Sequence, residues 1–116
     1  MTYKTFDVVA VPFPFSDSGE SKKRPAIVLS SSLTFSNKIG HSIFAMITSA
    51  RNEPWPLDVE IRDLANAGLP KPSVIRMKFF TLDNNLIVKV LGSLGPKDRI
   101  AISKVFKTVF LDLLSA

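Results

Sequence analysis

Short apolar runs, separated by polar stretches that contain proline or glycine, fill the first two thirds of the chain. Runs of this length that are rich in β-branched or aromatic residues, or that alternate with polar residues, are typical of strands. The pattern predicts five strands, at residues 7–13, 25–30, 42–47, 57–61 and 73–79. The first run carries apolar side chains on both sides, which predicts a strand with two covered faces.

The fourth run, at residues 57–61, alternates strictly. Its apolar residues are Leu57, Val59 and Ile61, and the charged Asp58 and Glu60 stand between them. This two-residue period predicts a half-exposed strand, with the three apolar side chains directed inward and the two carboxylates outward.

The C-terminal part of the chain has a helical period. Between Asp98 and Leu114 the apolar residues recur at three- and four-residue intervals, and Pro96 suits the start of a helix. We therefore expect an amphipathic helix that packs on the strands. The residues of its apolar face are Ile102, Val105, Phe106, Val109, Phe110 and Leu113.

Two shorter features complete the pattern. Residues 62–68 predict a helical turn that closes at Gly68, and the Asn84-Asn85 pair predicts a turn. The expected class is mainly β with α: a small barrel or curled sheet of about five strands with a C-terminal amphipathic helix. Because 116 residues hold enough material for one core, residues 1–116 are expected to form a single domain.

Composition narrows the function classes. Fifteen Lys and Arg against ten Asp and Glu give a net charge of +5, which favours anionic partners. A solvated surplus of lysines without a function is the alternative explanation of this charge. The absence of cysteine excludes disulfides, thiolate nucleophiles and cysteine-based zinc sites. No apolar stretch approaches the roughly 20 residues of a membrane span, and the start does not resemble a signal peptide. We expect a cytoplasmic protein without a membrane contact.

Common catalytic signatures are missing from the sequence. It contains no GxGxxG, GxxxxGK, HExxH or GxSxG motif, its carboxylates are scattered, and its one histidine, His41, has no evident partner. We therefore expect no metal and no cofactor, and an ordinary turn or surface role for His41.

A basic cluster stands where a polar loop meets a strand, in the run SKKRPAIVLSS. Pro25 restricts the residue before it to an extended backbone, so Arg24 becomes a fixed cation beside Lys22 and Lys23. The polar loop at 14–23 is expected to be mobile and to act as a lid ahead of Arg24. A solvated loop base is the alternative interpretation of the same cluster.

The order of motifs resembles one known family. The strand VVAVPFPF, a polar loop with serine and glycine, KKRPAIVLS, a strand ending in ITS and a later VIR…TLD segment follow one another as in the PemK/MazF toxin endoribonucleases of type II toxin–antitoxin systems. The resemblance covers essentially the whole chain. It implies an SH3-like small β-barrel, metal-independent and sequence-preferring cleavage of single-stranded RNA by 2′-hydroxyl attack, a homodimer, and neutralisation by an antitoxin protein.

The resemblance also implies site residues. Arg24 matches the arginine of the family's RP element, Thr48 the threonine that closes the third strand, and Arg76 an arginine that some members use. A guanidinium stays charged and can hold two phosphate oxygens, so Arg24 and Arg76 are expected to stabilise charge and donate a proton. Thr48 would position the phosphate or ribose. The general base is left unassigned.

Further residues are expected to bind RNA. Lys22, Lys23 and Lys78 would contact phosphates, and Ser49 adjoins Thr48. Trp55, between Pro54 and Pro56, offers a base a stacking surface, or equally anchors its own loop in the core.

Three positions depart from the family. Phe6 stands where a glycine commonly precedes Asp7, Lys78 where some relatives have an aspartate, and Ser18 where the same relatives have a loop histidine. The first change is expected to alter only the turn before the strand. The other two leave acid–base chemistry in doubt, and they keep open a catalytically inactive RNA-binding barrel.

A toxin that binds protein instead of cutting RNA is also compatible with this fold. A related family with the same barrel poisons DNA gyrase by protein binding, but the C-terminal Leu113-Leu114-Ser115-Ala116 offers no obvious anchor for that role.

The three expected catalytic residues also have ordinary structural interpretations. Without the resemblance, Arg24 would be expected to pair with Asp58 or Glu60, Thr48 to satisfy backbone groups, and Arg76 to be solvated.

Overall fold

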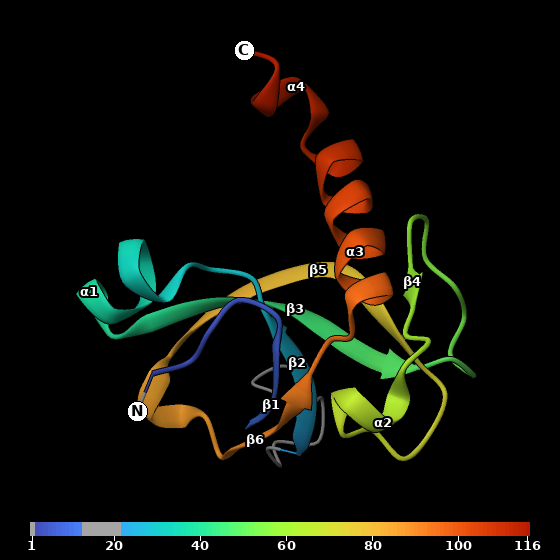
Figure 1. The fold of residues 1–116 in the computed structure, drawn as a ribbon, viewed down its shortest axis with the longest axis horizontal. Coiled ribbons are helices and arrows are strands. Elements are labelled where there is room, and N and C mark those ends of the chain that lie inside the picture. The colour runs from blue at the N-terminus through green and yellow to red at the C-terminus, as the bar shows by residue number, and fades with distance from the viewer. Residues whose placement is uncertain (1, 13–21) are drawn as a thin grey trace.

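The computed structural model describes residues 2–12 and 22–116 (Figure 1). Ser18 and nearly all of the predicted lid at 14–23 lie outside these residues. Six strands form one antiparallel sheet in the order β4-β5-β3-β2-β1-β6. The strands are β1 (Asp7–Pro12), β2 (Lys23–Val28), β3 (His41–Ser49), β4 (Val59–Glu60), β5 (Ser73–Asp83) and β6 (Lys89–Ser93).

Helical segments connect and follow these strands. The connections hold η1 (Ser32–Ser36), α1 (Asn37–Ile39), α2 (Leu64–Ala67) and η2 (Asn84–Leu86), and the chain ends with α3 (Pro96–Val109) and α4 (Leu111–Leu114). Figure 1 shows α3 standing on the curled sheet and carrying α4 away from it. No helix among the described residues is long and apolar enough to cross a bilayer.

The sheet is covered on both faces, as the first strand predicts. Along β1, Val8 joins a cluster with Ile27, Ile47 and Ile102 of α3, whereas Val9 joins a second cluster with Val28 and Phe44. Successive side chains of a strand point to opposite faces, so this alternation gives each face its own apolar cluster.

The expected fold class is confirmed: the protein is mainly β, with a curled sheet and a C-terminal helix. The turn at Asn84-Asn85 and the helix end at Gly68 (φ +71°) are also present. Strand β6, however, is missing from the five predicted strands. Its Gly92 weakens the strand pattern, but a side chain there would collide with the backbone of Asn66 and Ala67.

The predicted helix from Asp98 to Leu114 is confirmed as far as Val109 but is interrupted near its C-terminal end. The helix breaks at Phe110 (φ −107°, ψ 28°), and Leu113 is 72% exposed. The rings of Phe106 and Phe110 pack on each other (4.7 Å) and Phe110 stacks on Phe79 of β5 (5.4 Å). Beyond this aromatic contact the chain has left the sheet, so the remaining apolar positions find no strand to pack on.

Among the described residues, two side chains other than glycine lie on backbone with positive φ. Leu57, predicted to point inward, has a φ of +66° and is exposed, because β4 begins only at Val59. Val59 and Ile61 are buried as expected. Phe6 has a φ of +77° in the turn before β1, a conformation that glycine adopts without strain.

A basic groove across the ends of β2 and β3

A groove of about 580 Å³ lies where β2 begins and β3 ends. We call it the basic groove, because Lys22, Lys23, Arg24 and Lys71 all line it. Five predicted site residues line this groove, three from residues 22–24 and two, Thr48 and Ser49, from the end of β3. The remaining lining residues are Pro25, Ile47, Thr48, Ser49, Asn52, Leu69, Pro70 and Ser73.

Strand register explains why Arg24 and Thr48 come together. The ladder between β2 and β3 pairs Val28 with Phe44 and Ala26 with Met46. The paired residues end there, and the two strands continue by two residues each to Arg24 and Thr48, which line the same groove. Pairing of the two strands therefore brings the two expected catalytic side chains to one end of the sheet.

Thr48 is held in a defined orientation. It is 5% exposed, and its Oγ1 accepts a hydrogen bond of 2.6 Å from Nδ2 of Asn52. The hydroxyl proton stays available for donation to another acceptor, since a hydroxyl both accepts and donates. Sequence reasoning missed Asn52 and Lys71. The sequence gives only weak indications of either residue. Asn52 follows Thr48 by four residues, and Lys71 stands between Pro70 and Pro72.

Arg76 does not line the basic groove. In β5 it pairs with Met46, so it lies on the same face as Thr48 but one row further along the sheet. Its Nε and one Nη donate to the two carboxylate oxygens of Asp58, at 3.3 and 3.1 Å. Asp58, one of the partners that the sequence leaves open for Arg24, thus pairs with Arg76.

Trp55 and Lys78 also lie outside the groove lining. The guanidinium carbon of Arg76 lies 5.0 Å from the ring centroid of Trp55. Lys78 is exposed and shares the face of Arg76, two residues further along β5. The predicted site residues therefore form two groups on one face, the basic groove and the surroundings of Arg76.

His41 and metal ligands play no part in this arrangement. His41 begins β3, at the strand end opposite Thr48, and its Nδ1 lies 3.0 Å from the carbonyl oxygen of Ile39. Within residues 2–12 and 22–116, no three His, Cys, Asp or Glu side chains gather as a metal site would require.

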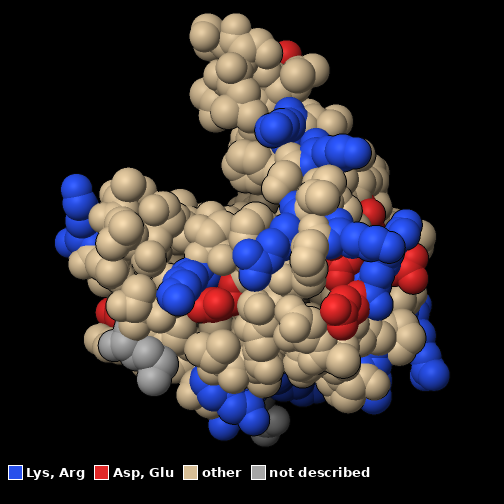
Figure 2. Space-filling view, in the orientation of Figure 1, with Lys and Arg blue, Asp and Glu red and all other residues tan. Residues whose placement is uncertain are grey.

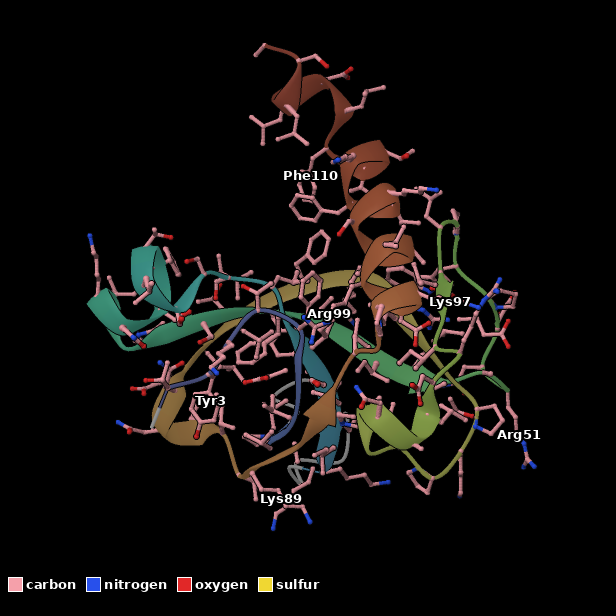
Figure 3. All side chains as sticks on the ribbon, in the orientation of Figure 1. Tyr3, Arg51, Lys89, Lys97, Arg99 and Phe110 are labelled. Carbon is pink, nitrogen blue, oxygen red and sulfur yellow. The ribbon has the colours of Figure 1, made fainter. Side chains whose placement is uncertain are left out.

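Basic charge is not confined to the groove. Figure 2 shows Lys and Arg side chains along α3 as well, interspersed near its base with Asp and Glu. In Figure 3, Lys97 lies at the start of α3, and Arg51 points outward from the loop after β3. The net charge alone therefore singles out no one place, whereas the groove gathers four basic residues beside Thr48.

Comparison with known proteins supplies the family. The model of the PemK-like, MazF-like toxins of type II toxin–antitoxin systems matches residues 4–110. The chain belongs to this family. No curated protein matches it in sequence.

Several solved structures share the PemK/MazF fold. One is the Mycobacterium tuberculosis toxin MazF-mt6, with a TM-score of 0.71 and 19% identity over 90% of this chain and 95% of that one. Another is MazE–MazF from Deinococcus radiodurans, with a TM-score of 0.74 and 16% identity over 95% and 97%. A third, a mycobacterial endoribonuclease in complex with its cognate antitoxin, has a TM-score of 0.69 and 15% identity over 91% and 92%. These similarities establish the fold of this family member.

Proposed function

We propose that this PemK/MazF family toxin is an endoribonuclease that cuts single-stranded RNA at preferred sequences in the cytoplasm, without a metal ion. One observation carries the proposal: Arg24 and Thr48 line the same groove, beside three lysines. Lysine and arginine attract the phosphate backbone, and a hydroxyl beside them can orient one phosphate group. The endoribonuclease with a similar fold supports the same activity.

The proposed reaction begins with the ribose 2′-hydroxyl, which attacks the adjacent phosphorus. The bond from phosphorus to the 5′-oxygen breaks, leaving a cyclic phosphate on one fragment and a 5′-hydroxyl on the other. Arg24 stabilises the negative charge that develops on the phosphoryl oxygens, because its planar fork can bind two of them. Thr48 donates its hydroxyl proton to the phosphate or ribose, while Asn52 holds its oxygen. No residue is assigned as general base.

Lys22, Lys23, Lys71 and Ser49 would bind the RNA backbone on either side of the scissile phosphate. Lys78, two residues beyond Arg76 along β5, would extend this phosphate contact. Trp55 would contact a base, since single-strand binding combines basic grooves with aromatic surfaces.

The partner proteins follow from the family. We propose that an antitoxin with an acidic, disordered segment fills the basic groove and so excludes RNA by the same electrostatics. A fold-related MazF occurs with MazE, which supports this partnership. Mixing the protein with the small product of the neighbouring gene tests it. Binding that also stops RNA cleavage is expected, and failure to bind would contradict it.

A homodimer is also proposed, supported by the C-terminal segment. Leu111, Leu113 and Leu114 of α4 are all more than half exposed, and α4 as a whole stands away from the sheet (Figure 1). Exposed apolar side chains gathered on one segment mark a protein contact. Light scattering should give twice the chain mass of 12.8 kDa. The variant Leu113→Glu/Leu114→Glu should become monomeric, while Leu33→Glu, at an exposed apolar residue of η1, should remain a dimer.

The decisive experiment is cleavage of a long single-stranded RNA in EDTA, with the cut ends mapped. The control variant is Lys38→Ala, in α1 just before β3 begins and so at the strand end opposite Thr48. Wild type and this control should give the same discrete cuts with cyclic phosphate ends. Arg24→Ala should give no detectable cuts in the time that the wild type needs for complete cleavage. Intact RNA with the wild-type protein would contradict the proposal. RNA that is bound but uncut would then indicate an inactive RNA-binding barrel, and RNA that is not bound a protein-binding toxin.

A further inference from the structure

Trp55 is neither a buried anchor nor a freely moving side chain. It remains 44% exposed, although the guanidinium of Arg76 lies over its ring at 5.0 Å from the centroid. A guanidinium stacked on an indole fixes the plane of the ring. The indole therefore has one supported side and a large accessible surface.

Arg76 is itself held on three sides. Its Nε and one Nη donate to the carboxylate of Asp58, and the same Nη donates to the carbonyl oxygen of Glu53 at 2.8 Å. The side chains of Arg76 and Asp58 are only 9% and 11% exposed. A guanidinium with these partners is compensated in charge and fixed in orientation, so it serves poorly as a phosphate ligand.

Asp58, the partner of Arg76, also forms hydrogen bonds with the backbone of Trp55. The amide of Trp55 donates to Oδ2 of Asp58 at 2.9 Å, and the amide of Asp58 donates to the carbonyl of Trp55 at 3.3 Å. Between them, Leu57 adopts a φ of +66°, which turns the chain back on itself. Main chain and side chain of Trp55 thus depend on one ion pair.

The loop that carries Trp55 also reaches the basic groove. Asn52, near the start of this loop, donates to Thr48. The far end of the loop is tied to Arg76, which lies diagonally across from Thr48, because β3 and β5 pair Thr48 with Val74 and Met46 with Arg76. The loop of residues 52–58 therefore carries the indole of Trp55 and contacts the basic groove through Asn52.

We propose that Trp55 stacks on a nucleobase next to the scissile phosphate and so contributes to sequence preference, with Arg76 as a positioning residue that acts through Trp55. This inference rests on the proposed ribonuclease function. Every base has an aromatic face, and a supported indole beside a basic groove is the combination that single strands bind. The predicted catalytic role of Arg76 is replaced here by a role in recognition.

The protein contains one tryptophan, so its fluorescence reports on this contact alone. The probe is a 2′-O-methyl RNA of about ten nucleotides, within the usual range for single-strand sites, centred on the mapped cut and therefore uncleavable. Its binding should quench Trp55. Moving one abasic position along the probe should abolish quenching at one or two positions only. Quenching that no abasic position changes, or none with the intact probe, would overturn the inference.

Kinetics separate this inference from the proposed function. Trp55→Ala should raise KM about ten- to a hundredfold, the range for one lost base stack, and change kcat much less. Leu33→Ala, at an exposed apolar side chain of η1, is the matched control and should change neither. A wild-type protein that cuts RNA while Trp55→Ala keeps its KM would overturn the inference and leave the ribonuclease intact. Absence of wild-type cleavage would instead defeat the proposed function.

The role of Arg76 is tested in two backgrounds. Since Arg76→Ala alone strands the Asp58 carboxylate and endangers folding, the paired variant Asp58→Ala/Arg76→Ala is used. It should raise KM as Trp55→Ala does and lose the fluorescence quenching. Added to Trp55→Ala, it should raise KM by less than twofold more, because two changes that act through one contact are not additive. A fall in kcat of a hundredfold or more in both backgrounds would show a catalytic Arg76 and overturn this assignment.

Discussion

Two arginines on the same face of one sheet have opposite surroundings. Arg24 shares the basic groove with three lysines, whereas Arg76 shares its place with the carboxylate of Asp58 and the ring of Trp55. Gathered positive charge attracts phosphate, and a compensated ion pair fixes a geometry. Residue type alone therefore does not assign a role, since neighbours decide whether an arginine binds substrate or organises the protein.

The sharpest contrast should appear in stability. Arg76→Ala leaves a mostly buried carboxylate without its counter-charge and should lower the free energy of unfolding by about 3–5 kcal/mol. Arg24→Ala, at a partly exposed residue of the groove, should lower it by less than Arg76→Ala does. Urea denaturation measures both. Equal losses for the two variants would erase the distinction, and Asp58→Ala/Arg76→Ala should lose less than Arg76→Ala alone.

The cleavage rate should show the reverse order, with a larger loss for Arg24→Ala than for removal of Arg76. Removing one charge-stabilising donor typically lowers the rate about 10²–10³-fold, which is the loss expected for Arg24→Ala. Arg24→Lys should recover only part of the rate, because lysine lacks the planar fork. Single-turnover cleavage at saturating enzyme measures the chemical step. A normal rate for Arg24→Ala would remove the groove from the mechanism.

Thr48→Val tests the second groove residue without changing its shape. Hydrogen bonds to charged groups contribute about 1.5–3 kcal/mol, so the cleavage rate should fall about ten- to a hundredfold. Asn52→Ala, which leaves Thr48 unsupported, should have a smaller effect of the same sign. The same single-turnover assay applies. A greater loss for Asn52→Ala than for Thr48→Val would mean that Asn52 itself contacts the RNA.

Salt dependence distinguishes gathered from dispersed charge. Each phosphate contact on a single strand adds about −0.7 to the slope of log K against log salt concentration. Lys71→Ala, in the groove, should therefore reduce the slope of the uncleavable probe by about 0.7, and Lys38→Ala on α1 should leave it unchanged. Fluorescence titration across a salt series measures both. Equal reductions would show that RNA does not distinguish the groove from the rest of the surface.

The smallest effect concerns strain beside Trp55. Leu57 is exposed and holds a φ of +66°, so Leu57→Gly should raise the free energy of unfolding by about 0.5–1 kcal/mol. Leu57→Ala, which keeps the strained backbone and shortens the side chain, is the control and should not stabilise the protein. Denaturant midpoints compare the two. Destabilisation by glycine would show that the leucine side chain holds the loop in place.

Local sequence determined a large part of this structure. Short apolar runs and two-residue alternation identified five of the six strands, and alternation identified the two covered faces of β1, because a strand's side chains alternate whatever it pairs with. The three- and four-residue period identified α3, and the Lys22 to Arg24 run identified one wall of the groove. Motif order also gave the family, which the match over residues 4–110 confirms.

Contacts between distant segments decided the rest. The long helix ends where the chain turns at Phe110 and leaves the sheet, and Leu57 is exposed because β4 starts only at Val59. The local hydrophobic period predicts neither limit. Contacts between distant segments place Arg24 and Thr48 in one groove and Asp58 beside Arg76. A sequence specifies each side chain's chemistry locally, but the charges and partners around it are set only when strands far apart in the chain pair.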